Sequence, residues 1–133
     1  MNMLSDEKKY EKLLQQFISG VECTINVDYG NKASVKKNNK GTDQYRKAAK
    51  LINEQFVDNH KKEHFAKFLS HPTAEIRINC AVCMIELMDY SEEWRMKALE
   101  IIKAEYPQKP LFEKSMINIW LKEQGFDEIE KTF

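Results

Sequence analysis

Glycine and proline are scarce in this chain, with four glycines and three prolines among 133 residues. Folds built from many short strands need more of both, because tight turns depend on them. No segment keeps the apolar–polar alternation of a half-buried strand, and residues 26–29 come nearest. Charged residues make up 32% of the chain, mostly lysine and glutamate, which favour helix. We therefore expect an all-α protein.

Long apolar runs are also absent. The longest, CAVCMI at residues 80–85, is six residues, whereas a membrane helix needs about 20. The opening residues, MNMLSDEKKYEK, contain no apolar core of signal-peptide length. Three cysteines, an odd number, fit free thiols in a reducing compartment. These absences predict a protein with no membrane partner, and the cytoplasm is the expected compartment.

The apolar spacing divides residues 1–133 into about six helices within a single domain. The expected helices cover 5–28, a second segment ending near 58, 61–70, 73–88, 91–106 and 110–125. Short connections predict antiparallel pairs, arranged as a compact bundle or a short solenoid. Residues 126–133 are expected to form a tail with Phe126 folded back. The start of the second helix is ambiguous, because local propensity makes 38–41 a loop and Thr42 a cap.

The segment 71–90, HPTAEIRINCAVCMIELMDY, is the one around which the chain is organised. Pro72 ends the preceding structure, and the Thr73 hydroxyl is expected to cap a new helix. Two adjacent faces of that helix are apolar, which predicts burial on several sides. The first face holds Ile76, Cys80, Cys83 and Leu87, and the second holds Ala81, Met84, Ile85 and Met88.

Two further helices follow. Ser91 is expected to cap the fifth, Pro110 to open the sixth, and Gly125 to end it. The buried side of the last helix is expected to hold Met116, Ile117, Trp120 and Leu121.

Two short motifs match patterns that occur in metal or redox sites. Cys80-x-x-Cys83 lies in mid-helix, whereas a redox pair uses a helix N-terminus to lower the thiol pKa. Residues 60–64, HKKEH, match an inverted zinc-hydrolase motif, but Asp58-Asn59 predicts a break that leaves His60 outside the next helix. We expect buried core thiols and solvated histidines. The sequence therefore predicts no metal, no cofactor and no enzyme, and a zinc enzyme is the alternative.

Charge is unevenly distributed although the net charge is zero. Residues 1–70 hold 13 basic and 9 acidic residues, and residues 71–133 hold 8 and 12. The basic side chains gather at Lys32, Lys36, Lys37, Lys40, Arg46, Lys47 and Lys50. Without an aromatic stacking series, we expect a solvated helix face there, and nucleic-acid contact is the alternative.

Acidic and aromatic side chains meet at the turn between the fourth and fifth helices. The candidate partner-binding residues are Asp89, Tyr90, Glu92, Glu93 and Trp94. One interpretation is a helix cap with favourable charge and a buried tryptophan. The other is a rim that grips a basic partner, because tyrosine, tryptophan and complementary charge are common in tight interfaces.

The residues LSHP at 69–72 and EIRINCA at 75–81 resemble the start of a HEAT-type repeat. The longer order is similar to a family of small bacterial HEAT-like domains of uncharacterised proteins. That likeness runs through YGNKASVKKNNKGTDQYRKAAKLI, FLSHPTAEIRINCAVCMIEL and FEKSMINIWLKEQGF, over about residues 7–125. It implies that the second helix starts earlier and runs through Asn39, and Gly41 inside that helix is a departure from the family pattern.

Some members of that family occur as immunity proteins beside toxins. The resemblance therefore implies an immunity protein that neutralises a cognate protein toxin domain, which we expect to be a basic nuclease. It supplies no catalytic residue. The alternatives are a nucleic-acid-associated helical module and a general protein-interaction module.

Overall fold

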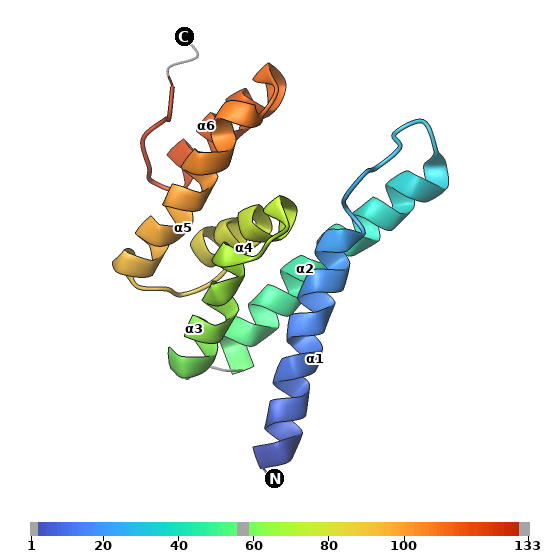
Figure 1. Ribbon diagram of the computed structural model, residues 1–133, viewed down its shortest axis with the longest axis vertical. Coiled ribbons are helices and arrows are strands. Elements are labelled where there is room, and N and C mark those ends of the chain that lie inside the picture. The colour runs from blue at the N-terminus through green and yellow to red at the C-terminus, as the bar shows by residue number, and fades with distance from the viewer. Residues whose placement is uncertain (1–2, 56–58, 131–133) are drawn as a thin grey trace.

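The computed structural model describes the backbone of residues 3–55 and 59–130, and the side chains of 7–55 and 62–130. Within these ranges the protein is all-α, with six α-helices, two 3-10 turns and no strand (Figure 1). The elements are α1 (Met3–Glu22), α2 (Lys32–Gln55), α3 (Asn59–Ala66), η1 (Lys67–Ser70), α4 (Ala74–Glu86), α5 (Glu92–Glu105), η2 (Tyr106–Gln108) and α6 (Leu111–Glu123). The predicted fold class and the number of helices are confirmed.

The two long helices α1 and α2 lie side by side and antiparallel (Figure 1), and α4 and α5 form the next most extensive contact. The prediction that the first helix reaches residue 28 is wrong, because α1 ends at Glu22. The Thr24 hydroxyl donates to the Val21 carbonyl at 2.6 Å, and Asn26 takes a positive φ of 59°. This local side-chain bond offers the backbone an alternative to continued helix.

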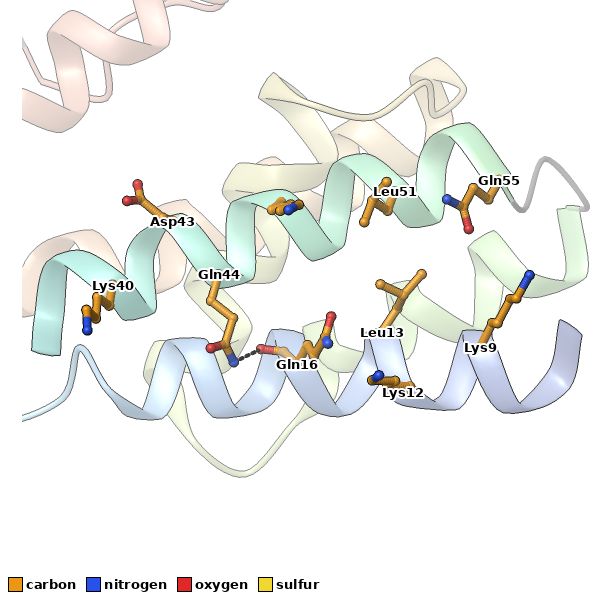
Figure 2. A pocket seen from close by; sticks show the side chains of 10 residues that line it. Lys9, Lys12, Leu13, Gln16, Lys40, Asp43, Gln44, Leu51 and Gln55 are labelled. Atoms are coloured by element: carbon orange, nitrogen blue, oxygen red, sulfur yellow. Dashed lines mark hydrogen bonds between the residues drawn. The ribbon is translucent and has the colours of Figure 1, made fainter. Parts of the chain in front are cut away.

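The start of α2 agrees with the family resemblance and not with local propensity. The helix begins at Lys32, where the side-chain oxygen of Asn31 accepts a bond from the Ser34 N–H at 3.1 Å. Thr42 is therefore inside the helix, and its hydroxyl donates to the Asn38 carbonyl at 3.1 Å instead of capping. Two residues later, Figure 2 shows the side-chain amide of Gln44 reaching α1, where it donates to the Gln16 carbonyl at 2.9 Å.

Helix α4 is the centre of the core, as predicted. It contacts α1, α2, α3, η1 and α5. The apolar positions predicted to be buried in this segment are buried except for Leu87, which is half-buried: Ile76, Cys80, Ala81, Cys83, Met84, Ile85 and Met88. Contact with α4 therefore helps to position α1, α2, α3, η1 and α5.

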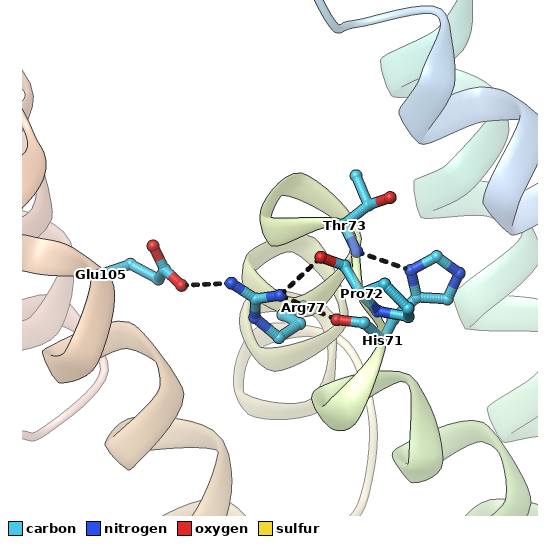
Figure 3. Close-up of polar contacts among 5 residues, drawn as sticks. All are labelled: His71, Pro72, Thr73, Arg77 and Glu105. Carbon is cyan, nitrogen blue, oxygen red and sulfur yellow. Dashed lines mark hydrogen bonds and ion pairs between the residues drawn. The ribbon is translucent and has the colours of Figure 1, made fainter.

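The N-terminus of α4 is ordered by Arg77 (Figure 3). Its guanidinium donates to the carbonyls of His71 at 2.8 Å and Pro72 at 3.0 Å, and it pairs with Glu105 at 2.7 Å. The predicted cap by the Thr73 hydroxyl is wrong, because that side chain makes no capping bond. The Thr73 N–H instead donates to Nδ1 of His71 at 3.0 Å. Arg77 thus fixes the turn and also ties α4 to the end of α5.

Residues at the C-terminal end return along α6. Gly125 has a φ of 87°, the left-handed geometry that ends many helices, and the Phe126 N–H donates to the Leu121 carbonyl at 2.8 Å. The buried Asn118 then accepts from the Ile129 N–H at 2.8 Å and donates to the Glu130 carbonyl at 3.1 Å. Phe126 is folded back as predicted. Pro110 was expected to be the first residue of the last helix, and it is instead the N-cap that precedes the first residue of α6.

Candidate protein-interaction surface

The structure brings the five candidate partner-binding residues together at the α4–α5 turn. Asp89 is exposed, and its carboxylate accepts from the Asn53 amide at 3.1 Å. The Tyr90 hydroxyl points inward and donates to the Lys62 carbonyl at 2.6 Å. Burial, with further contributions from nearby Cys80 and Tyr10, raises the pKa of Tyr90 well above its ordinary value. Tyr90 therefore holds α3 against this turn.

Glu92 and Glu93 are exposed in the first turn of α5, after the Ser91 side chain that caps the helix as predicted. Trp94 is half-buried, and the Lys97 ammonium lies 4.2 Å from its ring centroid. Lys97 is also 3.9 Å from the Glu93 carboxylate. A polar cavity of about 210 Å³ adjoins this turn, lined by Lys62, Glu63, Asp89, Tyr90, Ser91 and Trp94. At this rim the carboxylates face solvent, while the two aromatic rings are largely occupied by intramolecular contacts.

A second surface lies on α6, where sequence reasoning expected only the core side. Met116 was predicted to be buried, and this is wrong, because its side chain is 52% exposed. Three neighbours on the same helix are also exposed: Leu111 by 75%, Phe112 by 76% and Ile119 by 54%. Phe112, Met116 and Ile119 are four and three residues apart and so share one helix face. We call these four residues the α6 ridge.

The α6 ridge continues into an apolar pocket lined by α4, α5, η2 and α6. The pocket has a volume of about 260 Å³, and Met116 belongs to both features. Its other lining residues are Ile78, Val82, Ile102, Glu105, Tyr106, Lys109, Ile117 and Trp120. Contiguous exposed apolar surface of this kind marks interaction sites on proteins. The sequence carries one indication of this exposed surface: apolar residues occur around most of α6, whereas only one side of the helix reaches the core.

The two cysteines of the C-x-x-C motif are buried in the core, as predicted. The Cys80 thiol lies 3.6 Å from the Phe65 carbonyl. Burial, followed by the neighbouring thiol, raises the pKa of Cys80, and burial raises the pKa of Cys83 to about 12. Since the thiolate is the reactive form, both groups are inert near neutral pH.

The H-x-x-E-H motif lies on α3. That helix begins at Asn59, so the prediction that His60 falls outside it is wrong. The side chain of His60 is outside the described residues. His64 is exposed, and its ring centroid is 5.8 Å from that of Tyr10. Among the residues that the structure describes, no three His, Cys, Asp or Glu side chains are grouped to hold a metal.

No protein-family model, curated protein or solved structure matches this chain. No helix in the described part of the chain has the length and apolar content needed to cross a bilayer. The surface chemistry described above therefore carries the functional argument.

Proposed function

We propose that this chain works by binding another protein, and that the α6 ridge with its adjoining pocket is the main contact. The observation that carries the proposal is the exposure of Leu111, Phe112, Met116 and Ile119 beside an apolar pocket. Aromatic residues and methionine are enriched in the buried centres of protein interfaces. A half-exposed methionine at the mouth of an apolar pocket adapts to the shape of an inserted side chain.

The specific version of this proposal is an immunity protein that neutralises a cognate toxin domain of basic charge. The resemblance to small bacterial HEAT-like domains favours this class of partner. The exposed carboxylates of Asp89, Glu92 and Glu93 would attract a basic surface and orient its approach, while the ridge supplies desolvated contact. A stable complex needs about 800 Å² on each partner.

Co-expression with the product of the adjacent gene tests the proposal. We expect a stable complex and protection of the cell from that product. Met116→Ser should weaken the complex at least tenfold, since a central apolar anchor typically contributes 2 kcal/mol or more. Met96→Ser is the matched control, because Met96 is a 40% exposed methionine on α5 that does not line the pocket.

Charge reversal at the α4–α5 turn distinguishes electrostatic steering of the partner's approach from the apolar contact that holds the complex. Glu92→Lys with Glu93→Lys should slow association and reduce its salt dependence, with a smaller effect on dissociation. If the adjacent product neither binds the chain nor loses toxicity, the immunity proposal fails. If a complex forms and tolerates both Phe112→Ser and Met116→Ser, the α6 ridge is not the contact.

A further inference from the structure

A groove runs between α1 and α2, on elements other than those of the α6 ridge. Its volume is about 600 Å³. Four lysines line it, two from each helix: Lys9, Lys12, Lys40 and Lys47. Figure 2 labels the first three of them. Leu13 and Leu51 also line it, and Asp43 is its one carboxylate. The chain therefore presents an elongated channel of excess positive charge that the sequence did not reveal, because Lys9 and Lys12 are far from the basic stretch.

Most lysines of the described surface have no carboxylate partner, and these four are among them. Within the described residues, none of the four lies within 4 Å of a carboxylate. By contrast, Lys97, Lys103, Lys109 and Lys122 each pair with a glutamate at 3.3–3.9 Å. The groove thus keeps its ammonium groups available for an external anion.

The length of the groove indicates a polymer. Its α2 wall consists of residues at steps of four, three, four and four: Lys40, Gln44, Lys47, Leu51 and Gln55. From Lys40 to Gln55 the wall extends about 22 Å at 1.5 Å per residue. One strand carries a phosphate every 3.4 Å along the axis of a duplex, and the spacing is wider in an extended single strand, so that distance spans at most roughly six phosphates. A single small anion would instead require the ammonium groups to converge on one point.

The use of lysine as the cationic side chain indicates that the groove binds phosphate groups and not carboxylates. No arginine and no aromatic residue lines the groove. Protein partners are usually gripped by aromatic anchors and by arginine forks on carboxylates, whereas lysine serves phosphate as a point charge. Side-chain amides of Gln16 and Gln55 add neutral donors of the kind that contact phosphate and sugar.

We infer that the α1–α2 groove binds the sugar–phosphate backbone of single-stranded nucleic acid. Among the described residues, no ring lines the groove to stack on bases, so backbone charge alone holds the strand. Binding is therefore weaker than at sites with aromatic stacking, indifferent to base sequence and dependent on salt. This inference is independent of the protein-binding proposal, because the two surfaces share no residue.

Fluorescence anisotropy with labelled 12-nucleotide oligo(dT) and oligo(U) tests the inference on the full chain. We expect both to bind at 50 mM salt, with log K falling linearly with log salt by about 0.7 for each phosphate contacted. Lys40→Gln with Lys47→Gln should weaken binding about tenfold and lower that slope by about 1.4. Lys103→Gln with Lys122→Gln is the matched control, and we expect it to bind like the wild type.

Four outcomes would overturn the inference. They are absence of binding at 50 mM salt, equal losses in the groove and control variants, equal displacement by polyglutamate, and tighter binding of a duplex of the same length. Circular dichroism of each variant shows whether it keeps its helical fold, and Lys9→Gln with Lys12→Gln provides a second groove variant on the opposite wall. Since Phe112→Ser lies outside the groove, it should leave oligonucleotide binding unchanged.

Discussion

Gly41 of α2 lies directly against Gly20 of α1. A β-carbon on Gly41 would come within 2.5 Å of the Gly20 carbonyl oxygen and within 2.5 Å of the Cys23 β-carbon. A β-carbon on Gly20 would meet the Gly41 carbonyl oxygen at 2.7 Å. The two backbones touch at this crossing, so glycine is required on both helices. This contact offsets the cost of about 1 kcal/mol that each glycine imposes on its helix.

Gly41→Ala should therefore destabilise the protein by about 1–3 kcal/mol, because the overpacked crossing outweighs the gain in helix propensity. Urea unfolding followed by circular dichroism measures the change. Asn39→Ala is the control in the same helix, at an exposed position where alanine should be neutral or slightly stabilising. Wild-type stability in Gly41→Ala would mean that α1 and α2 do not approach so closely.

Gly20 and Gly41 also show what cannot be predicted from local sequence. Helical spacing found α4 and its buried faces, and the residue type at Ser91 found the cap of α5. Propensity read Gly41 as a loop residue because the reason for it is on another helix, 21 positions earlier. Thr73 failed as a cap for a similar reason, since Arg77 and His71 had already ordered that turn.

The candidate surfaces differ in the same way, because one is formed by residues that are near in sequence and another by residues that only the fold brings together. The α4–α5 rim was found because Asp89 and Trp94 are neighbours in the chain. The α1–α2 groove joins Lys12 to Lys47, which no local pattern connects. On α6, the sequence placed Met116 and Leu121 together on the buried side, and only the fold shows that Leu121 is covered while Met116 is exposed.

Asn118→Ala should cost about 1–3 kcal/mol and loosen the returning C-terminal segment. The buried amide also donates to the Tyr106 hydroxyl at 3.0 Å, so its loss leaves the Tyr106 hydroxyl, the Ile129 N–H and the Glu130 carbonyl without this partner. Hydrogen exchange at the Ile129 amide should accelerate in the variant. Glu123→Ala, at an exposed position of α6, should leave that exchange rate unchanged.

Alkaline pH should destabilise the protein through its buried thiols. The pKa of Cys83 is raised by burial from its ordinary value of 9.0 to about 12, so above pH 9 the unfolded chain loses a proton that the folded chain keeps. Stability is therefore full below pH 9 and falls as the pH rises toward 12, with a slope of up to about 1.4 kcal/mol per pH unit for this thiol.

Urea unfolding between pH 8 and 11 measures that slope. Cys83→Ala should make it shallower, although the variant is less stable at every pH because a buried side chain is shortened. Ile85→Val is the control, since it removes a buried methyl group without removing a proton. If the free energy of unfolding falls equally steeply with pH in Cys83→Ala and the wild type, ionisation of the Cys83 thiol does not cause the alkaline destabilisation.

Glu86 connects three helices, because its carboxylate is 2.7 Å from the Arg46 guanidinium of α2 and accepts from the Trp120 indole N–H of α6 at 3.0 Å. The Glu86 side chain is 25% exposed, so these interactions are only partly screened by solvent. A double-mutant cycle with Arg46→Ala and Glu86→Ala should give a coupling energy of about 1 kcal/mol. In a Trp94→Phe background, Glu86→Ala should also shift the Trp120 emission to the red.

The exposed pair Glu100–Lys103, at 3.9 Å, is the matched control for that cycle. Its coupling should be near zero, because both side chains are well hydrated and either can turn toward water without loss. A similar value for the Arg46–Glu86 pair would mean that Glu86 does not link α2 to α4. If the Trp120 emission also stays unchanged in Glu86→Ala, the placement of α6, and with it the orientation of the α6 ridge, depends on apolar contacts such as those of the buried Leu121.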